Sequence, residues 1–107
     1  MEYRNILGTD LRVSPVCFGM MYGSDVRKDP KLKAQALRRA LNSGINVVHS
    51  CVEYGTLPVL TSVLDELPNS HDLVHIIKMD VPNNDDNNVF YPDKFRRRVE
   101  DLSLIHI

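Results

Sequence analysis

The sequence predicts an α/β fold in which parallel strands are covered by helices. Short apolar runs alternate with amphipathic stretches, and the amphipathic stretches carry helix-start and helix-stop residues. After an opening hairpin the order is β-α-β-α-β-α, which favours a parallel sheet. The chain has 107 residues, 43% of them apolar and 25% charged, so we expect one compact globular domain.

The first elements are a hairpin and a short strand. Residues 3–13 place apolar residues on both sides of a turn signal that begins at Gly8, which predicts the hairpin. Residues 16–19 (VCFG) form a short apolar run that ends at glycine. Such a run is typical of a buried strand of a parallel sheet.

The next element is the most clearly marked helix. Asp29 suits the N-cap, Pro30 suits the first helical position, and Gly44 suits the position after the C-cap. Apolar residues recur between them at helical spacing: Leu32, Ala36, Leu37, Ala40 and Leu41. Basic residues fall on the other side, where we expect a solvated face: Lys31, Lys33, Arg38 and Arg39.

Four further segments complete the alternation. Residues 45–49 predict a second buried strand, and a helix over 56–67 has Pro58 in its first turn and Pro68 beyond its end. Residues 73–79 (LVHIIKM) predict a third strand. A polar loop over 83–88 then leads to a helix that begins near Pro92 or Asp93, because residues 95, 99 and 102 are apolar.

Charge and cysteine content exclude several classes of partner. The formal net charge is −1, so there is no electrostatic basis for binding nucleic acid or an anionic membrane. No apolar run is long enough to span a bilayer, and the N-terminus lacks the layout of a signal peptide. Cys17 and Cys51 do not make a disulfide framework, so we expect a reduced, cytoplasmic protein.

Residues at the strand ends are the candidates for chemistry, since ligands meet the C-terminal ends of parallel strands. They are Gly19 and Met20 after the first strand, His49 and Tyr54 after the second, and Lys78 at the end of the third. A buried lysine beside a tyrosine stabilises the phenolate and makes the phenol a usable proton donor. The alternative is a plain loop tyrosine and a strand-end lysine whose ammonium reaches solvent.

Three segments resemble the aldo-keto reductase family. MEYRNILGTDLRVSPVCFGM resembles its opening M-x-Y-R-x-L-G-x-T-G-L-x-V-S-x-L-x-L-G-T, and ALRRALNSGINVVHSCVEYG resembles A-L-x-x-A-L-D-x-G-I-N-F-F-D-T-A-x-x-Y-G. IIKMDVP lies where that family places its strand-three lysine. The resemblance extends to about Asp101 and implies the N-terminal portion of a (β/α)8 barrel, a TIM barrel whose base the hairpin closes.

The resemblance also implies NADPH-dependent reduction of a small-molecule carbonyl substrate. Tyr54 would donate the proton, Lys78 would tune it, and Gly19 and Met20 would contact the cofactor. His49 stands where the family has an aspartate that pairs with the lysine, and an imidazole supplies no permanent negative charge. We therefore expect weakened or altered catalysis, and a buried Lys78 would hold its proton less tightly. The alternative for His49 is a hydrogen-bonded core histidine.

The C-terminus departs from the family in a second way. DLSLIHI superficially resembles the family's strand-four D-x-x-L-x-H, but His106 follows Lys78 too closely. LSLIHI is also the direct translation of CTG TCT CTT ATA CAC ATC, which resembles a transposase adapter used in sequencing libraries. We expect residues 1–101 to be the N-terminal part of a barrel, and residues 102–107 to be a non-native tail. A complete barrel needs roughly 250 residues, so we predict no reductase activity for this chain alone.

Other interpretations remain open. A non-catalytic or regulatory barrel of the same family would bind cofactor without turnover. Cys17, His49 and Cys51 are all zinc-ligand types, although no ligand spacing supports a metal site, and Asp85-Asp86 lacks the spacing of a calcium loop. Residues 20–22 (MMY) suit either a substrate pocket or apolar packing. His71 and His75 are interpreted as structural or surface residues, and the sequence does not determine the oligomeric state.

Overall fold

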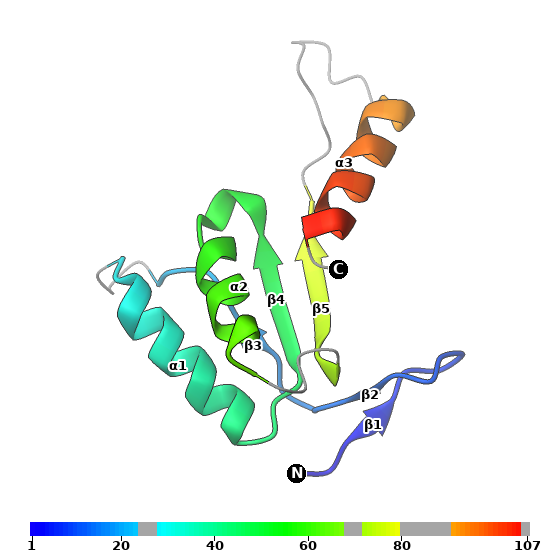
Figure 1. The fold of residues 1–107 in the computed structure, drawn as a ribbon. Coiled ribbons are helices and arrows are strands. Elements are labelled where there is room, and N and C mark those ends of the chain that lie inside the picture. Colours follow the sequence, from blue (N-terminus) through cyan, green and yellow to red (C-terminus); the bar gives the residue numbers. More distant parts are fainter. Residues whose placement is uncertain (24–27, 68–71, 80–90, 106–107) are drawn as a thin grey trace.

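The computed structural model describes residues 1–23, 28–67, 72–79 and 91–105, and it confirms the predicted order of elements (Figure 1). A 3-10 turn that the sequence did not predict, η1, follows β4. The elements are β1 (Arg4–Asn5), β2 (Arg12–Val13), β3 (Phe18–Gly19), α1 (Pro30–Asn42), β4 (Val47–Cys51), η1 (Val52–Tyr54), α2 (Leu57–Asp65), β5 (Val74–Lys78) and α3 (Pro92–Ile105).

The strands form two separate sheets. β1 and β2 pair antiparallel as the predicted hairpin, whereas β3, β4 and β5 pair parallel in that order. Helices α1 and α2 lie together on one side of the parallel sheet (Figure 1). This is a partial α/β fold, with β4 in the middle of its parallel sheet, and no complete barrel is formed by the described residues.

The helix limits of α1 follow from the residues at its ends. The Asp29 carboxylate accepts a hydrogen bond from the Lys31 backbone N–H at 2.9 Å, and Pro30 occupies the first helical position. Beyond the C-cap, Gly44 has φ +99°, a backbone conformation that residues other than glycine rarely adopt. The predicted start and stop of this helix are therefore confirmed.

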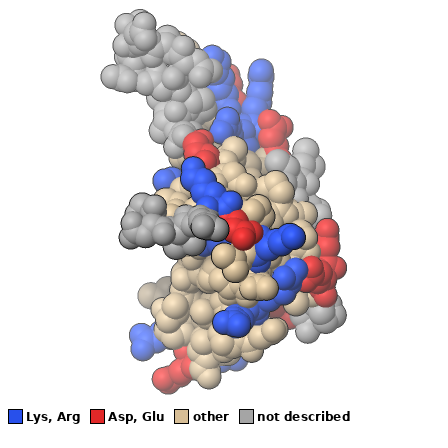
Figure 2. All heavy atoms as spheres, turned by 90° about the vertical axis from the view of Figure 1, so that its left-hand side faces the viewer, with Lys and Arg blue, Asp and Glu red and all other residues tan. Residues whose placement is uncertain are grey.

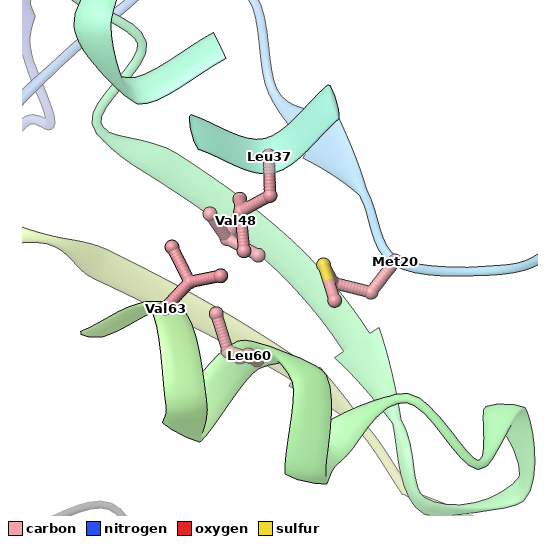
Figure 3. Close-up of a cluster of buried hydrophobic side chains, with 5 residues drawn as sticks. All are labelled: Met20, Leu37, Val48, Leu60 and Val63. Carbon is pink, nitrogen blue, oxygen red and sulfur yellow. The ribbon is translucent and has the colours of Figure 1, made fainter. Parts of the chain in front are cut away.

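The hydrophobic core lies between the parallel sheet and the two helices that cover it. Five side chains with no exposed surface meet there from β4, α1, α2 and the segment after β3: Met20, Leu37, Val48, Leu60 and Val63 (Figure 3). Phe18 packs against them from β3. The prediction of a fully buried first strand is wrong, because Val16 is 54% exposed and Cys17 is exposed. The helices α1 and α2 cover only one face of the sheet.

Two basic residues on the face of α1 that was predicted to be solvated, Lys33 and Arg38, form hydrogen bonds with other segments. Arg38 donates to both carboxylate oxygens of Glu66, beyond the end of α2, at 2.7 and 2.8 Å. Lys33 is half-buried and donates to backbone carbonyls of the segment after β3. Elsewhere on the side of the molecule that carries α1, Lys and Arg side chains are interspersed with Asp and Glu (Figure 2).

Asn46 ties the N-terminal hairpin to the parallel sheet. Its side-chain oxygen accepts from the Ser14 N–H at 2.7 Å, and its side-chain nitrogen donates to the Arg12 carbonyl at 2.8 Å. Asn46→Ala should lower the free energy of unfolding by about 1–3 kcal/mol, since one part-buried and one exposed hydrogen bond are lost. Urea unfolding measures this loss, with Asn42→Ala at the exposed end of α1 as the control. An equal, near-zero loss in both variants would contradict the assignment.

Several sequence features fall outside the described residues: the loop over 83–88, His71, Asp85, Asp86 and His106. Part of the predicted tail is helical, because α3 continues from Pro92 to Ile105. The Leu102 side chain is only 6% exposed. The native or artificial origin of residues 102–107 stays a prediction. Among the described residues, no helix is long and apolar enough to cross a membrane.

Candidate functional site at the carboxyl ends of the parallel strands

The register of the sheet brings the predicted site residues onto one face. Gly19 of β3 lies opposite His49 of β4, and Lys78 of β5 lies opposite Cys51 of β4. Val48 points into the core, and side chains alternate along a strand. His49 and Cys51 therefore face the other way, on the side of the sheet that the core helices do not cover. We call this side of the sheet, which carries His49 and Cys51, the site face. In a barrel built from such units, this face would point to the interior.

Tyr54 is brought to this face by the turn after β4. Residues 52–54 form η1, and Gly55 ends it in the left-handed conformation with φ +68°. The Tyr54 ring then lies beside the His49 ring, with the centroids 6.2 Å apart and the planes at 58°. The Lys78 Nζ lies 5.2 Å from the Tyr54 ring centroid, within the range of a cation–π contact. Two of the predicted catalytic residues, His49 and Lys78, thus lie next to the third, Tyr54.

The exposure of these residues differs from the expectation. Tyr54 and His49 are half-buried, but Lys78 is exposed, so the premise of a buried lysine is not met in the described structure. The reason is geometric, since Lys78 ends β5, the outer strand of the parallel sheet, and points to the uncovered face. His49 is half-buried beside Tyr54, and its interpretation as a hydrogen-bonded core histidine stays an alternative.

Glu53, the residue before Tyr54, makes a second set of contacts. The buried Cys51 thiol donates a hydrogen bond to the Glu53 carboxylate, and Arg98 of α3 lies 3.6 Å from the same carboxylate. Burial, and then the hydrogen bond to Glu53, raise the pKa of Cys51, while the positive charge of Lys78 acts in the opposite direction. Cys51 is therefore a protonated thiol near neutral pH, and a poor nucleophile.

Glu53 was missed as a site residue by sequence reasoning, which named it only as part of a polar loop. The available signal was its place directly before Tyr54. Its carboxylate connects β4 to α3 through Cys51 and Arg98. These contacts restrain the turn that carries the tyrosine.

Gly19 and Met20, the predicted cofactor contacts, are placed differently. Met20 has no exposed surface and its side chain packs in the core (Figure 3), so the predicted contact of Met20 with a cofactor is not open in the described structure. Its N–H donates to the His49 carbonyl at 2.9 Å. Gly19 is exposed, and a Cβ built on it would meet no atom within 4 Å. The space over Gly19 is therefore open next to His49, which suits the close approach of a ligand.

The remaining candidate residues lie apart from this site. The Ser50 hydroxyl and His75 Nε2 are 2.5 Å apart, and their register with Val48 places both on the helix side of the sheet. Ser50 has no exposed surface, so this pair is structural. Within the described ranges, no three His, Cys, Asp or Glu residues are grouped to hold a metal ion.

Comparison with known proteins adds one finding. No family model matches the sequence, and no curated protein matches it. Among solved structures, the chain is similar to an aldo-keto reductase, the glycerol dehydrogenase AKR11B4 from Gluconobacter oxydans, with a TM-score of 0.62 and 23% identity. The match covers 96% of this chain and 35% of that chain. At this identity the likeness establishes the fold: the chain has the architecture of about a third of a barrel protein.

Proposed function

We propose that residues 1–101 are the opening βα units of an NADPH-dependent carbonyl reductase related to the aldo-keto reductases. The observation that carries this proposal is the assembly of Tyr54 between His49 and the Lys78 ammonium, at the strand ends where such barrels bind ligands. Three sequence segments that resemble the family and a solved structure with the same architecture support it. A small-molecule carbonyl substrate and a cytoplasmic location belong to the same proposal.

In the proposed reaction, Tyr54 is the proton donor. Its hydroxyl hydrogen-bonds the substrate oxygen and protonates it as the carbonyl carbon is reduced, which is general acid catalysis. The Lys78 ammonium stabilises the phenolate that remains. His49 lines the same place and orients the substrate oxygen by hydrogen bonding. The Glu53 contacts hold the Tyr54 turn in position.

The residues present fit one end of a nicotinamide cofactor. When bound, NADPH supplies the hydride that reduces the carbonyl carbon. The open space over Gly19, beside His49, admits a flat ring close to the backbone. Gly19 would hold this end of the cofactor, while the family resemblance implies that the phosphate and adenosine contacts come from later strands.

The proposal is tested in what we term the barrel form. Here residues 1–101 are followed by the remaining βα units, taken from the native reading frame or from the matched Gluconobacter oxydans dehydrogenase. NADPH oxidation is measured with glyceraldehyde first, because that neighbour is named a glycerol dehydrogenase. Cofactor-dependent reduction is expected. A folded barrel form from either source that neither binds NADPH nor reduces any carbonyl would contradict the proposal.

The isolated 107-residue chain should show no reductase activity. Its site face lies open to solvent at Lys78, and catalysis by positioned charges depends on exclusion of water. NADPH oxidation is followed by absorbance with the same carbonyl panel. Measurable turnover that disappears in Tyr54→Phe would overturn this expectation.

His49→Asp should raise carbonyl reduction by the barrel form by about tenfold or more, since a carboxylate at this position would pair with the Lys78 ammonium, as the family resemblance implies for the aspartate. His49→Asn is the matched control, because it has nearly the size of aspartate without the charge. The readout is kcat/KM for the aldehyde. An Asp variant no faster than the Asn variant would show that the missing charge does not limit the reaction.

The imidazole at position 49 also favours a second candidate function, a barrel that binds the cofactor without turnover. Here His49 removes the charge on which the chemistry depends, while the ligand-binding face is retained. NADPH fluorescence titration of the barrel form, together with the reductase assay, separates the two functions. Binding with no turnover in the wild type, together with turnover in His49→Asp, would favour the second.

A further inference from the structure

Lys33 is held in an unusual place for a helix lysine. It lies in the first turn of α1, yet its Nζ donates to the Gly19 carbonyl at 2.8 Å and to the Met21 carbonyl at 2.9 Å. The same Nζ lies 4.9 Å from the centroid of the Phe18 ring. One ammonium therefore contacts the last residues of β3 and the residues that follow it, across the connection from β3 to α1.

The contacts on the opposite side complete this restraint. The Met20 N–H donates to the His49 carbonyl of β4 at 2.9 Å, and the Met20 side chain is fixed in the core. Gly19 and Met21 flank Met20, and both of their carbonyls are bound by Lys33. The backbone from Gly19 to Met21 is thus held by β4 through one residue and by α1 through its two neighbours.

The two carbonyl acceptors make this arrangement selective for a cation. The Lys33 ammonium is partly desolvated there, which lowers the pKa of Lys33 from its ordinary 10.5. The two carbonyl oxygens replace part of that lost hydration. An apolar side chain of similar length, such as methionine, would leave both carbonyls without this donor.

We propose that Lys33 is a positioning residue of the candidate site, which fixes the Gly19–Met21 backbone so that the open space over Gly19 stays available to the reactive end of the cofactor. This inference rests on the proposed function. It adds a residue of α1, on the helix side of the sheet, that acts through the backbone it binds. Its predicted effect is on cofactor binding more than on the chemical step.

The first experiment uses the 107-residue chain and amide hydrogen exchange. In Lys33→Met, exchange of the Met20 amide should become about tenfold faster or more, since two hydrogen bonds to a charged donor are lost. The Val74 amide, which donates to the Asn46 carbonyl, should change far less. Lys31→Met, on the exposed surface of the same helix turn, is the control and should leave Met20 unchanged. Unchanged Met20 exchange in Lys33→Met, or equal acceleration at both amides, would overturn the proposal.

The second experiment uses the barrel form and separates positioning from simple stability. Lys33→Met should raise the KM for NADPH about tenfold with kcat changed less than about twofold, and Lys33→Arg should restore most of the affinity because its guanidinium donates to both carbonyls. Equal losses in Met and Arg variants, or a loss confined to kcat, would overturn the role. A wild-type barrel form without NADPH binding would overturn it together with the proposed function, whereas the exchange result at Met20 tests the Lys33 restraint by itself.

Discussion

Replacement of Tyr54 by phenylalanine should lower kcat for carbonyl reduction by the barrel form by roughly 10²–10⁴-fold, the usual contribution of a positioned general acid. The variant keeps the ring between His49 and the Lys78 ammonium and loses only the hydroxyl. NADPH affinity should therefore stay within about twofold of wild type, because the proposed cofactor contact lies at Gly19. Steady-state kinetics and NADPH fluorescence titration measure the two quantities separately.

The chain provides a matched control for this substitution. Tyr91 also carries a lysine ammonium over its ring, with the Lys94 Nζ 4.6 Å from the centroid, but it directly precedes α3 and follows no strand of the parallel sheet in the way Tyr54 follows β4. Tyr91→Phe should leave kcat nearly unchanged. Equal effects of the two substitutions, or a Tyr54→Phe enzyme with wild-type kcat, would show that Tyr54 is not the proton donor.

Leu60→Ala should destabilise the chain by about 2–5 kcal/mol, the range measured for buried leucine truncations. Leu60 has no exposed surface and extends from α2 into the core cluster that also contains Val48 and Val63 (Figure 3). Its removal leaves a cavity between α2 and the sheet, since neither strand nor helix can close it without disturbing the other contacts. Urea unfolding followed by circular dichroism gives the loss.

Leu32→Ala is the control for this prediction. Leu32 lies on α1 and is 51% exposed, so its truncation should cost less than about 1 kcal/mol. Leu60→Met conserves most of the volume and should also cost less than about 1.5 kcal/mol. A Leu60→Ala variant as stable as Leu32→Ala would show that the core does not depend on this contact.

The order and type of the elements followed from local patterns. The Asp29-Pro30 start of α1 depends on a hydrogen bond over two residues, and its stop depends on the freedom of Gly44 at positive φ. Both are properties of a few neighbouring residues, which is why they could be predicted. The turn η1 was missed because its three residues carry no periodic pattern.

The site was predicted in part for the same reason. Tyr54 and Lys78 follow strands whose limits were visible, and parallel strands carry their ends to one edge. The distance between them depends on the register of β4 with β5, which no local pattern contains. Lys78 is exposed in the described structure, and its burial could not be predicted because burial depends on what covers the outer strand of the sheet.

The sequence by itself determined the alternation of strands and helices, the caps of α1 and the identity of the polar residues at the strand ends, since each depends on neighbouring residues. Tertiary structure alone decided where the side chains point when two elements meet. It placed the Met20 side chain in the core and turned Lys33 from the expected solvated face to the carbonyls of Gly19 and Met21. The physical reason is that helical periodicity assigns a residue to a face of its own helix, whereas its hydrogen-bond partners come from segments that only folding brings near.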